Sequence, residues 1–242
     1  MKSDASTRVV DLFAVSARDC TPTPARHRAR VLFAPVLHDP DVIGHCASVL
    51  SEREKLRAVS LLAKGSGPHF KQQRAFQRYC GALATSSALP LSQIAFATTA
   101  NGRPYLPDFQ GYWFSFSSCP LGYVGAWSST HQIGVDIEDQ TTNLEATEIA
   151  QAYFSRAEAK TVEDAGELVR MRTFFQLWTF KEAALKSIGE GLPFGLDAFR
   201  FELYPSIRMI DAPRAYGGPE RFSAYTMEKA NSCIALVIRS GS

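Results

Sequence analysis

Residues 174–189 have the sequence FFQLWTFKEAALKSIG, and this stretch determines how the second half of the chain is organised. Its centre is rich in strong helix formers and it ends on a glycine, which is a helix stop signal, so it predicts a helix. In that helix Trp178, Glu182 and Lys186 share one stripe, because they recur at every fourth position. The neighbouring apolar face consists of Leu177, Ala184, Leu185 and Ile188. We therefore expect Glu182 and Lys186 to lie at the edge of the buried side.

A strand with strict alternation precedes this helix at residues 133–138, IGVDIE. Successive residues of a strand point to opposite faces, so the β-branched residues share one face while Asp136 and Glu138 share the other. Two carboxylates at i and i+2 of a strand lie roughly 7 Å apart. An edge strand with acidic decoration, half-exposed to solvent, is the alternative interpretation of this segment.

These two segments acquire a chemical meaning if the helix edge packs over the acidic face of the strand. Asp136, Glu138 and Glu182 would then converge, and their mutual repulsion calls for a hard cation. Ligands that are all oxygen suit Mg²⁺, which keeps coordination positions open for water and substrate phosphates. Lys186 would be a point charge for phosphate. The alternatives are an ordinary i, i+4 ion pair between Glu182 and Lys186, and a core role for Trp178.

The rest of the chain mixes strand and helix signals. Strand-like runs occupy residues 9–15 and 31–37. A helix is expected to start at Ser51, with Leu56, Val59 and Leu62 as its apolar members. After a glycine–proline break, a second helix is expected over about residues 70–83. Further strands are expected at 92–99, 112–118, 122–127, 131–138, 199–203, 222–227 and 233–238, with helices over roughly 143–189. The helix-then-strands order recurs on either side of about residue 130. We therefore predict an α+β fold with two halves, residues 1–130 and 131–242.

Composition excludes several classes of protein. The chain has 242 residues, 45% hydrophobic and 21% charged, which argues against disorder and coiled coils. A formal net charge of +2 is far from that of a dedicated nucleic-acid binder. The sequence has no signal-peptide pattern and no apolar run of roughly 20 residues, so we expect a cytoplasmic protein without a membrane span. Its five cysteines lack metal-ligand spacing and are expected to be reduced thiols.

Two motifs together resemble the signature pair of the surfactin-type, two-lobed class of 4′-phosphopantetheinyl transferases. They are GVDIE at residues 134–138 and WTFKEAALKSIGEGL at residues 178–192, and FSRAE at 154–158 fits the Phe-Ser-x-x-Glu element of that family. The resemblance extends over about residues 50–205. It implies two pseudo-symmetric lobes, each an antiparallel sheet with packed helices, and a site in the groove between them. The lobe of residues 1–130 would contact coenzyme A phosphates and dock the carrier protein, and the lobe of residues 131–242 would hold the metal carboxylates and the KEAxxK helix.

The resemblance also implies an activity. Such an enzyme uses Mg²⁺, or Mn²⁺ as an alternative, to transfer the 4′-phosphopantetheine group of coenzyme A to a serine of an apo acyl or peptidyl carrier protein, releasing adenosine 3′,5′-bisphosphate. Asp136, Glu138 and Glu182 would bind the metal, Glu182 would be the base near the serine hydroxyl, and Lys186 would hold the pyrophosphate. These roles agree with the physics, since phosphoryl-type transfer needs positioning and charge neutralisation. Because one chain supplies both lobes, we expect a monomer.

Several residues are candidates for binding coenzyme A by motif. Residues 101–106, NGRPYL, match the Gly-Lys-Pro-x-Leu turn of the family with Arg103 in place of Lys; a plain surface turn is the alternative. Two arginine pairs on the first two helices, at 53 and 57 and at 74 and 78, would hold the 3′-phosphate or order that lobe; a solvated face is their alternative. The full expected set is Arg53, Arg57, Arg103, Ser117, Asp136 and Lys186. Carrier proteins are commonly acidic, so the basic and apolar surface around these helices and around residues 64–70 is a candidate docking face.

Residues 114–119, FSFSSC, depart from the family pattern Phe-Asn-Leu-Ser-His-Ser. Ser117 is retained, but Ser118 replaces a histidine that contacts coenzyme A phosphate. A serine hydroxyl brings no positive charge, so we predict weaker affinity for coenzyme A than in relatives with the histidine. Cys119, in the position of the family's last serine, is expected to be an unreactive thiol.

Two other functions are compatible with parts of the sequence. A non-catalytic relative that binds coenzyme A or a carrier protein as a regulator is favoured by Ser118, and opposed by the retention of all three acids and Lys186. An unrelated Mg²⁺-dependent phosphohydrolase would need a hydrolytic motif, which the sequence lacks. The sequence leaves open which carrier is served, in fatty acid, polyketide or nonribosomal peptide synthesis.

Overall fold

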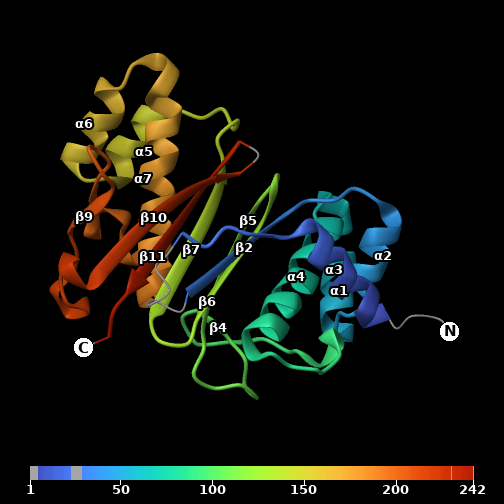
Figure 1. The fold of residues 1–242 in the computed structure, drawn as a ribbon. Coiled ribbons are helices and arrows are strands. Elements are labelled where there is room, and N and C mark those ends of the chain that lie inside the picture. Colours follow the sequence, from blue (N-terminus) through green and yellow to red (C-terminus); the bar gives the residue numbers. More distant parts are fainter. Residues whose placement is uncertain (1–4, 23–28, 230, 242) are drawn as a thin grey trace.

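The computed structural model describes residues 5–22, 29–229 and 231–241. Two antiparallel sheets lie face to face at the centre of the molecule, and helices cover their outer sides (Figure 1). The first sheet has the strand order β1 (Arg18–Asp19), β2 (Ala29–Pro35), β6 (Gly122–Ser128), β5 (Trp113–Cys119). The second has the order β10 (Phe222–Lys229), β11 (Ser232–Arg239), β7 (Gln132–Asp139). The predicted α+β class, with antiparallel sheets and packed helices, is confirmed.

The two sheets share a core because their strands alternate as the sequence predicts. Val31 and Val124 of the first sheet are fully buried and belong to the same apolar cluster as Val135 and Leu236 of the second. In β7 the apolar face consists of Ile133, Val135 and Ile137, as expected. The residues between them therefore lie on the opposite face of β7, against α7.

The first half of the chain places its helices on the outer side of the first sheet. These are α1 (Ala5–Ser16), α2 (Pro40–Ser48), α3 (Glu52–Ser60) and α4 (Gly67–Thr85), with the 3₁₀ turn η2 (Leu62–Lys64) after α3. The predicted start of α3 is confirmed, since Ser51 and Glu54 form a reciprocal capping box there. Between α4 and β5 the chain forms the turn η3 (Leu91–Gln93) and a hairpin of β3 (Ala97–Thr98) and β4 (Pro104–Tyr105).

Two expectations about this half are wrong. Residues 9–15 belong to helix α1 rather than to a strand, because Val9 and Phe13, one helical turn apart, are both buried while Val15 is exposed. Residues 92–99 form a strand only at Ala97–Thr98, where the hairpin pairs them. Short apolar runs give nearly the same signal for a strand and for one side of a helix, and packing decides between them.

The second half covers its own sheet with α5 (Ala146–Tyr153), α6 (Arg156–Asp164) and the long α7 (Glu167–Ile188). Four 3₁₀ turns and a small antiparallel pair complete the described part of this half: η4 (Leu192–Phe194), η5 (Leu196–Ala198), β8 (Arg200–Glu202), β9 (Arg208–Asp211), η6 (Arg214–Tyr216) and η7 (Pro219–Arg221). The predicted helices over 143–189 and strands near 199–203, 222–227 and 233–238 are confirmed.

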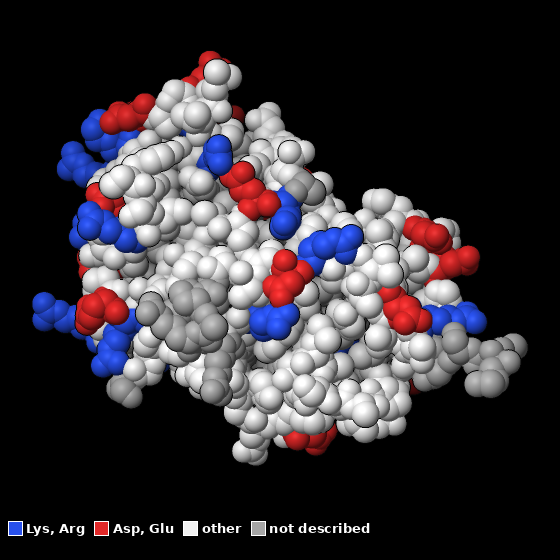
Figure 2. All heavy atoms as spheres, in the orientation of Figure 1, with Lys and Arg blue, Asp and Glu red and all other residues white. Residues whose placement is uncertain are grey.

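The surface carries both signs of charge and some apolar side chains. Figure 2 shows Lys and Arg interspersed with Asp and Glu over one face, in keeping with the net charge of +2. Leu56, Val59 and Leu62, predicted as the apolar members of the first helix, are exposed by 72%, 61% and 52%. In the described part of the chain, no helix is both long enough and apolar enough to cross a bilayer.

Candidate active site

The site is built where β7 meets α7, and Gly134 makes this contact close. A Cβ atom on Gly134 would lie 1.9 Å from the carbonyl oxygen of Ala183 and 2.5 Å from the backbone nitrogen of Ser187. Only glycine allows a strand and a helix to approach so closely. Because Gly134, Asp136 and Glu138 alternate with the buried apolar residues, both acids point to the side on which α7 lies.

Asp136 is at the centre of this contact and is only 3% exposed. Its Oδ1 accepts hydrogen bonds from Lys186 Nζ and Ser117 Oγ, each at 2.7 Å. Lys186 Nζ also donates to Ser117 Oγ at 3.1 Å and to the carbonyl oxygen of Val135 at 3.3 Å. Lys186 is therefore the ion-pair partner of Asp136. The sequence also allowed an i, i+4 ion pair between Glu182 and Lys186, and that pair does not form in the structure as described.

The other two acids have raised pKa values. Burial raises the pKa of Glu138 to about 7, with a further contribution from Asp136, while a hydrogen bond from Trp178 Nε1 at 3.2 Å opposes the rise. Burial, and then the charge of Asp136, raises the pKa of Glu182. The charge of Asp136 thus contributes to the raised pKa of both glutamates across the β7–α7 contact. The alternative from the sequence is right that β7 is an edge strand of its sheet, but wrong about exposure, since Asp136 is buried.

The donor chemistry at this contact fits a hard divalent cation. The three acids offer only oxygen, and Asp136 Oδ2 is buried without a hydrogen-bond partner in the structure as described. As they stand, no three His, Cys, Asp or Glu side chains of the described residues form a closed metal cluster. The carboxylates of Glu138 and Glu182 would have to turn toward Asp136 Oδ2 to share one ion.

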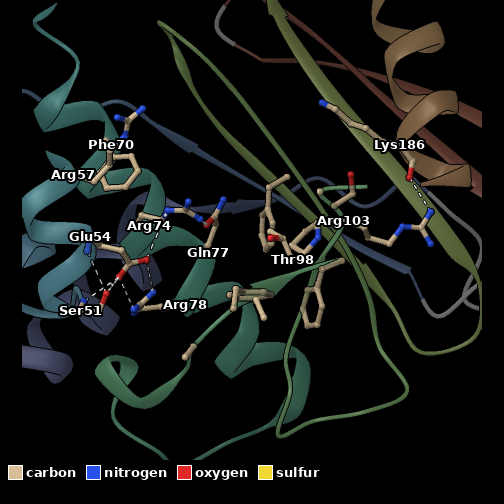
Figure 3. Close-up of a pocket in the computed structure, with 18 of the residues that line it drawn as sticks. Ser51, Glu54, Arg57, Phe70, Arg74, Gln77, Arg78, Thr98, Arg103 and Lys186 are labelled. Carbon is tan, nitrogen blue, oxygen red and sulfur yellow. Dashed lines mark hydrogen bonds and ion pairs between the residues drawn. The ribbon is translucent and has the colours of Figure 1, made fainter. Parts of the chain in front are cut away.

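A cleft of about 1030 Å³ opens beside this contact, between α3 and α4 on one side and the β3–β4 hairpin and the end of α7 on the other (Figure 3). Of the residues expected to bind coenzyme A, Arg53, Arg57, Arg103 and Lys186 line it. Ser117 and Asp136 do not line it, but both are bonded to Lys186 Nζ. The cleft therefore joins the basic residues of the first half to the acids of the second through Lys186.

The arginine pair of α4 divides into two roles. Arg78 is buried, and it donates to Glu54 Oε2 at 2.7 Å and to the carbonyl oxygen of Val49 at 3.0 Å, so it holds α3 and α2 to α4. Arg74 lines the cleft, with its guanidinium over the ring of Phe70. Burial lowers the pKa of Arg74, and its buried Nε lacks a hydrogen-bond partner in the described structure. Both arginines line the cleft, and Arg74 is the more exposed of the two; its Nη1 donates to Gln77 Oε1 at 2.8 Å and its Nε lies 3.7 Å from Glu54 Oε1.

Ser118 and Cys119 follow Ser117 on β5 and differ from it in surroundings. The hydroxyl of Ser118 accepts a hydrogen bond at 2.9 Å from Nε2 of Gln73 on α4. Burial raises the pKa of the Cys119 thiol, which agrees with the expected lack of reactivity. All five cysteines, each in the described part of the chain, are free.

Lys181 is a residue of this region whose role sequence reasoning missed. It is completely buried, and its Nζ lies 2.8 Å from Glu158 Oε2 and donates to the carbonyl oxygen of Leu196 at 3.0 Å. Glu158 is also the capping-box residue of α6, with Ser155 as its partner. The FSRAE element therefore anchors α6 to α7 rather than contacting the cleft. The signal was available, because a lysine at position 181 falls on the same helix face as Leu177, Ala184 and Ile188.

Comparisons with known proteins match the part of the chain that contains the three acids. The sequence model of the 4′-phosphopantetheinyl transferase superfamily matches residues 132–235, which include β7, α7 and all three acids. These residues are similar to that superfamily, and they make up less than half of the chain. The matched segment holds both motifs that suggested the family.

Named relatives extend the match into the first half. The chain is 33% identical over 117 residues to the 4′-phosphopantetheinyl transferase psf-1 of Bacillus pumilus, covering 48% of each chain. It is 33% identical over 116 residues to the 4′-phosphopantetheinyl transferase Sfp of Bacillus subtilis, covering 48% of this chain and 50% of Sfp. For the 4′-phosphopantetheinyl transferase gsp of Aneurinibacillus migulanus the identity is 30% over 153 residues, or 61% of each chain. The chain thus spans about half to three fifths of the length of these relatives.

Proposed function

We propose that this protein transfers the 4′-phosphopantetheine group of coenzyme A to a serine hydroxyl of an apo acyl or peptidyl carrier protein, releasing adenosine 3′,5′-bisphosphate. The observation that carries the proposal is the position of Lys186. Its side chain lines the arginine-rich cleft and at the same time bonds to Asp136 at 2.7 Å. A diphosphate lying in the cleft would therefore meet both a lysine and the acidic group that suits a divalent cation. The site draws on both halves of one chain, which supports a monomeric enzyme.

The cleft suits coenzyme A in size and charge. Ligand pockets commonly have volumes of roughly 300–1,000 Å³, and this cleft lies at the upper end of that range. Its first-half wall presents Arg53, Arg57 and Arg74, and guanidinium groups bind phosphate in a bidentate manner. We assign these arginines to the 3′-phosphate and Lys186 to the pyrophosphate, with Ser117 completing the polar wall around Lys186.

Asp136, Glu138 and Glu182 would hold Mg²⁺, since they are the oxygen donors that meet at the β7–α7 contact. A bound Mg²⁺ supplies neutralisation of the charge that develops on the pyrophosphate. Trp178 orients Glu138 by its hydrogen bond to Oε1. Glu182 accepts the proton of the serine hydroxyl, and its raised pKa makes it a better base than an exposed carboxylate.

The exposed face of α3 and η2 is the proposed docking surface for the carrier protein. Leu56, Val59 and Leu62 are large apolar side chains in solvent, and Arg53 and Arg57 lie on the same helix where it borders the cleft. Basic groups beside an apolar patch complement an acidic partner. A carrier bound there would bring its serine to the mouth of the cleft.

The activity is tested by incubating the protein with apo carrier protein, coenzyme A and Mg²⁺ and looking for a phosphopantetheine adduct by intact mass spectrometry. We expect the adduct with the wild type and with Glu167→Gln, an exposed glutamate on the same helix. Glu182→Gln and Asp136→Asn should abolish it while leaving the circular dichroism spectrum unchanged. Tight binding of coenzyme A without an adduct on any acyl or peptidyl carrier would instead establish the non-catalytic binding function.

The docking surface is tested separately. Leu56→Glu and Val59→Glu should raise the KM for the carrier protein while leaving the KM for coenzyme A unchanged. Leu168→Glu is the matched control, because Leu168 is 99% exposed on α7 and lies outside the docking surface. An equal effect of all three substitutions would remove α3 from the docking surface.

A further inference from the structure

The C-terminal end of α7 receives hydrogen bonds from an arginine of the other half of the chain. The helix ends at Gly189, which adopts a left-handed conformation with φ +79°, and Glu190 donates its N–H to the carbonyl oxygen of Leu185 at 3.1 Å. The last carbonyl groups of a helix lack partners within the helix. Here Arg103 Nη2 donates to the carbonyl oxygens of Ser187 at 2.9 Å and of Lys186 at 3.1 Å.

The hairpin that carries Arg103 holds its backbone in place. The N–H of Thr99 donates to the carbonyl oxygen of Arg103 at 2.9 Å, and the N–H of Arg103 donates to Thr99 Oγ1 at 3.1 Å. Gly102 makes the turn with φ +82°. From this turn the guanidinium reaches over the ring of Trp113, the first residue of β5, with 5.2 Å from Cζ to the ring centroid.

Gly189 leaves the space that the guanidinium occupies. A Cβ atom on Gly189 would lie 2.9 Å from Arg103 Nη2 and 3.1 Å from Cζ. The glycine is thus needed for its positive φ and for this close approach. A cation at this point also faces the negative end of the helix dipole, which stabilises it.

We propose that Arg103 is a positioning residue, which holds the end of α7 against the β3–β4 hairpin and thereby fixes Lys186 in the cleft, rather than a ligand of coenzyme A phosphate. Figure 3 shows the arrangement: Arg103 is joined to the backbone carbonyl of Lys186, while the Lys186 side chain extends elsewhere. That side chain bonds to Asp136 and Ser117. Arg103 therefore acts on the backbone from which the Lys186 ammonium group is placed. The catalytic consequence rests on the function proposed above for Lys186.

The two roles of Arg103 differ in what lysine can replace. If Arg103 were a phosphate ligand, Arg103→Lys would keep the positive charge and so retain part of the affinity for coenzyme A that Arg103→Met loses. In the positioning role, which we call the clamp, Arg103 needs a planar group that stacks on Trp113 and reaches two carbonyl oxygens. An ammonium group does not provide this. In the proposed role Arg103→Lys therefore behaves like Arg103→Met.

The test measures kcat and the KM for coenzyme A at two salt concentrations. We expect both Arg103 variants to lose roughly ten- to a hundredfold in kcat, because Lys186 is displaced, with the KM within about twofold of wild type. The salt dependence of KM should be unchanged, whereas it should fall in Arg53→Met, which removes a proposed phosphate ligand. In a Lys186→Met background the loss from Arg103→Met should disappear. An increase of KM that Arg103→Lys restores, with a weaker salt dependence, would overturn the proposal.

Amide hydrogen exchange in the free protein tests the clamp without reference to activity. We expect the amides of Gly189 and Glu190 to exchange at least about tenfold faster in Arg103→Met and Arg103→Lys than in wild type, while amides at the start of α7 do not change. Unchanged exchange at Gly189 and Glu190 would refute the clamp even if transfer activity falls. If the wild type transfers nothing, the proposed function fails while the exchange data still decide the role of Arg103. If Arg103→Met does not fold, Arg103→Lys carries both measurements.

Discussion

Gly134 gives the sharpest test of how this site is assembled, and the substitution that tests it is Gly134→Ala. The added Cβ would lie 1.9 Å from the carbonyl oxygen of Ala183, 2.5 Å from the backbone nitrogen of Ser187 and 2.9 Å from Cβ of Lys186. Ordinary contact begins at 3.4 Å, so α7 would have to retreat from β7 by about 1.5 Å. Two of the three obstructing atoms belong to the helix backbone, and a side-chain rotation therefore does not relieve the clash.

The expected loss of unfolding free energy follows from the need to shift the backbone of α7. Overpacking a core costs about 1–3 kcal/mol and more where a backbone must shift, and we expect about 3 kcal/mol of lost unfolding free energy here. For a chain of this size that corresponds to a fall in Tm of roughly 6–12 °C. The retreat also moves Glu182 and Lys186 away from Asp136. A misplacement of 1 Å at a reacting group costs about a hundredfold in rate, so kcat should fall by at least that factor.

The assay is urea unfolding followed by circular dichroism, together with the carrier-protein transfer reaction. Gly44→Ala is the matched control, because Gly44 lies inside α2 and a Cβ placed there meets nothing within 4 Å apart from its chain neighbours and the backbone of its own helix. Alanine at that position should stabilise the protein by about 0.5–1 kcal/mol and leave transfer unchanged. Unfolding free energies of Gly134→Ala and wild type within about 0.5 kcal/mol of each other, with transfer retained, would refute the close β7–α7 contact as the feature that assembles the site.

Three further predictions concern other features of the structure. Lys181→Met should lower the unfolding free energy by about 3–5 kcal/mol, because Glu158 is left buried without its partner. The double variant Lys181→Met with Glu158→Gln should regain part of that loss in the same urea titration. A loss below about 1 kcal/mol for Lys181→Met would contradict a buried ion pair. Ser118→His should lower the KM for coenzyme A by restoring the imidazole that the family pattern has at this position, whereas an unchanged KM in steady-state assays would count against this assignment. Burial raises the pKa of Cys46 to about 12 and that of Cys233 to about 11, so the native state keeps protons that the unfolded state releases above about pH 9. The unfolding free energy should therefore fall as pH rises from about 9 to about 11, by about 1.4 kcal/mol per pH unit for each of these thiols. Cys46→Ala should make this fall with pH less steep. An unfolding free energy independent of pH over this range would show that the native state does not keep the two thiols protonated.

The sequence determines those features that depend on neighbours only a few residues away. Capping boxes at Ser51 and at Ser155 begin α3 and α6, because their hydrogen bonds join residues three positions apart. The alternation of residues 133–138 separates the acids from the apolar face, and the spacing of residues 177–188 gives α7 its buried face. Residues 9–15 lie at the limit of this reasoning, because a short apolar run has no local feature that distinguishes a strand from a helix.

The tertiary structure decides which of these groups meet. Lys186 pairs with Asp136, fifty positions away along the chain, rather than with Glu182 one turn away, and Arg103 bonds to backbone carbonyls of α7. Leu56 and Val59 have helical spacing but face solvent, because α3 is held to α4 through Glu54 and Arg78. The physical reason is that a local pattern encodes the direction of a side chain relative to its own backbone. The partner that it meets depends on how closely two distant segments pack, which here is set by the missing side chain of a glycine.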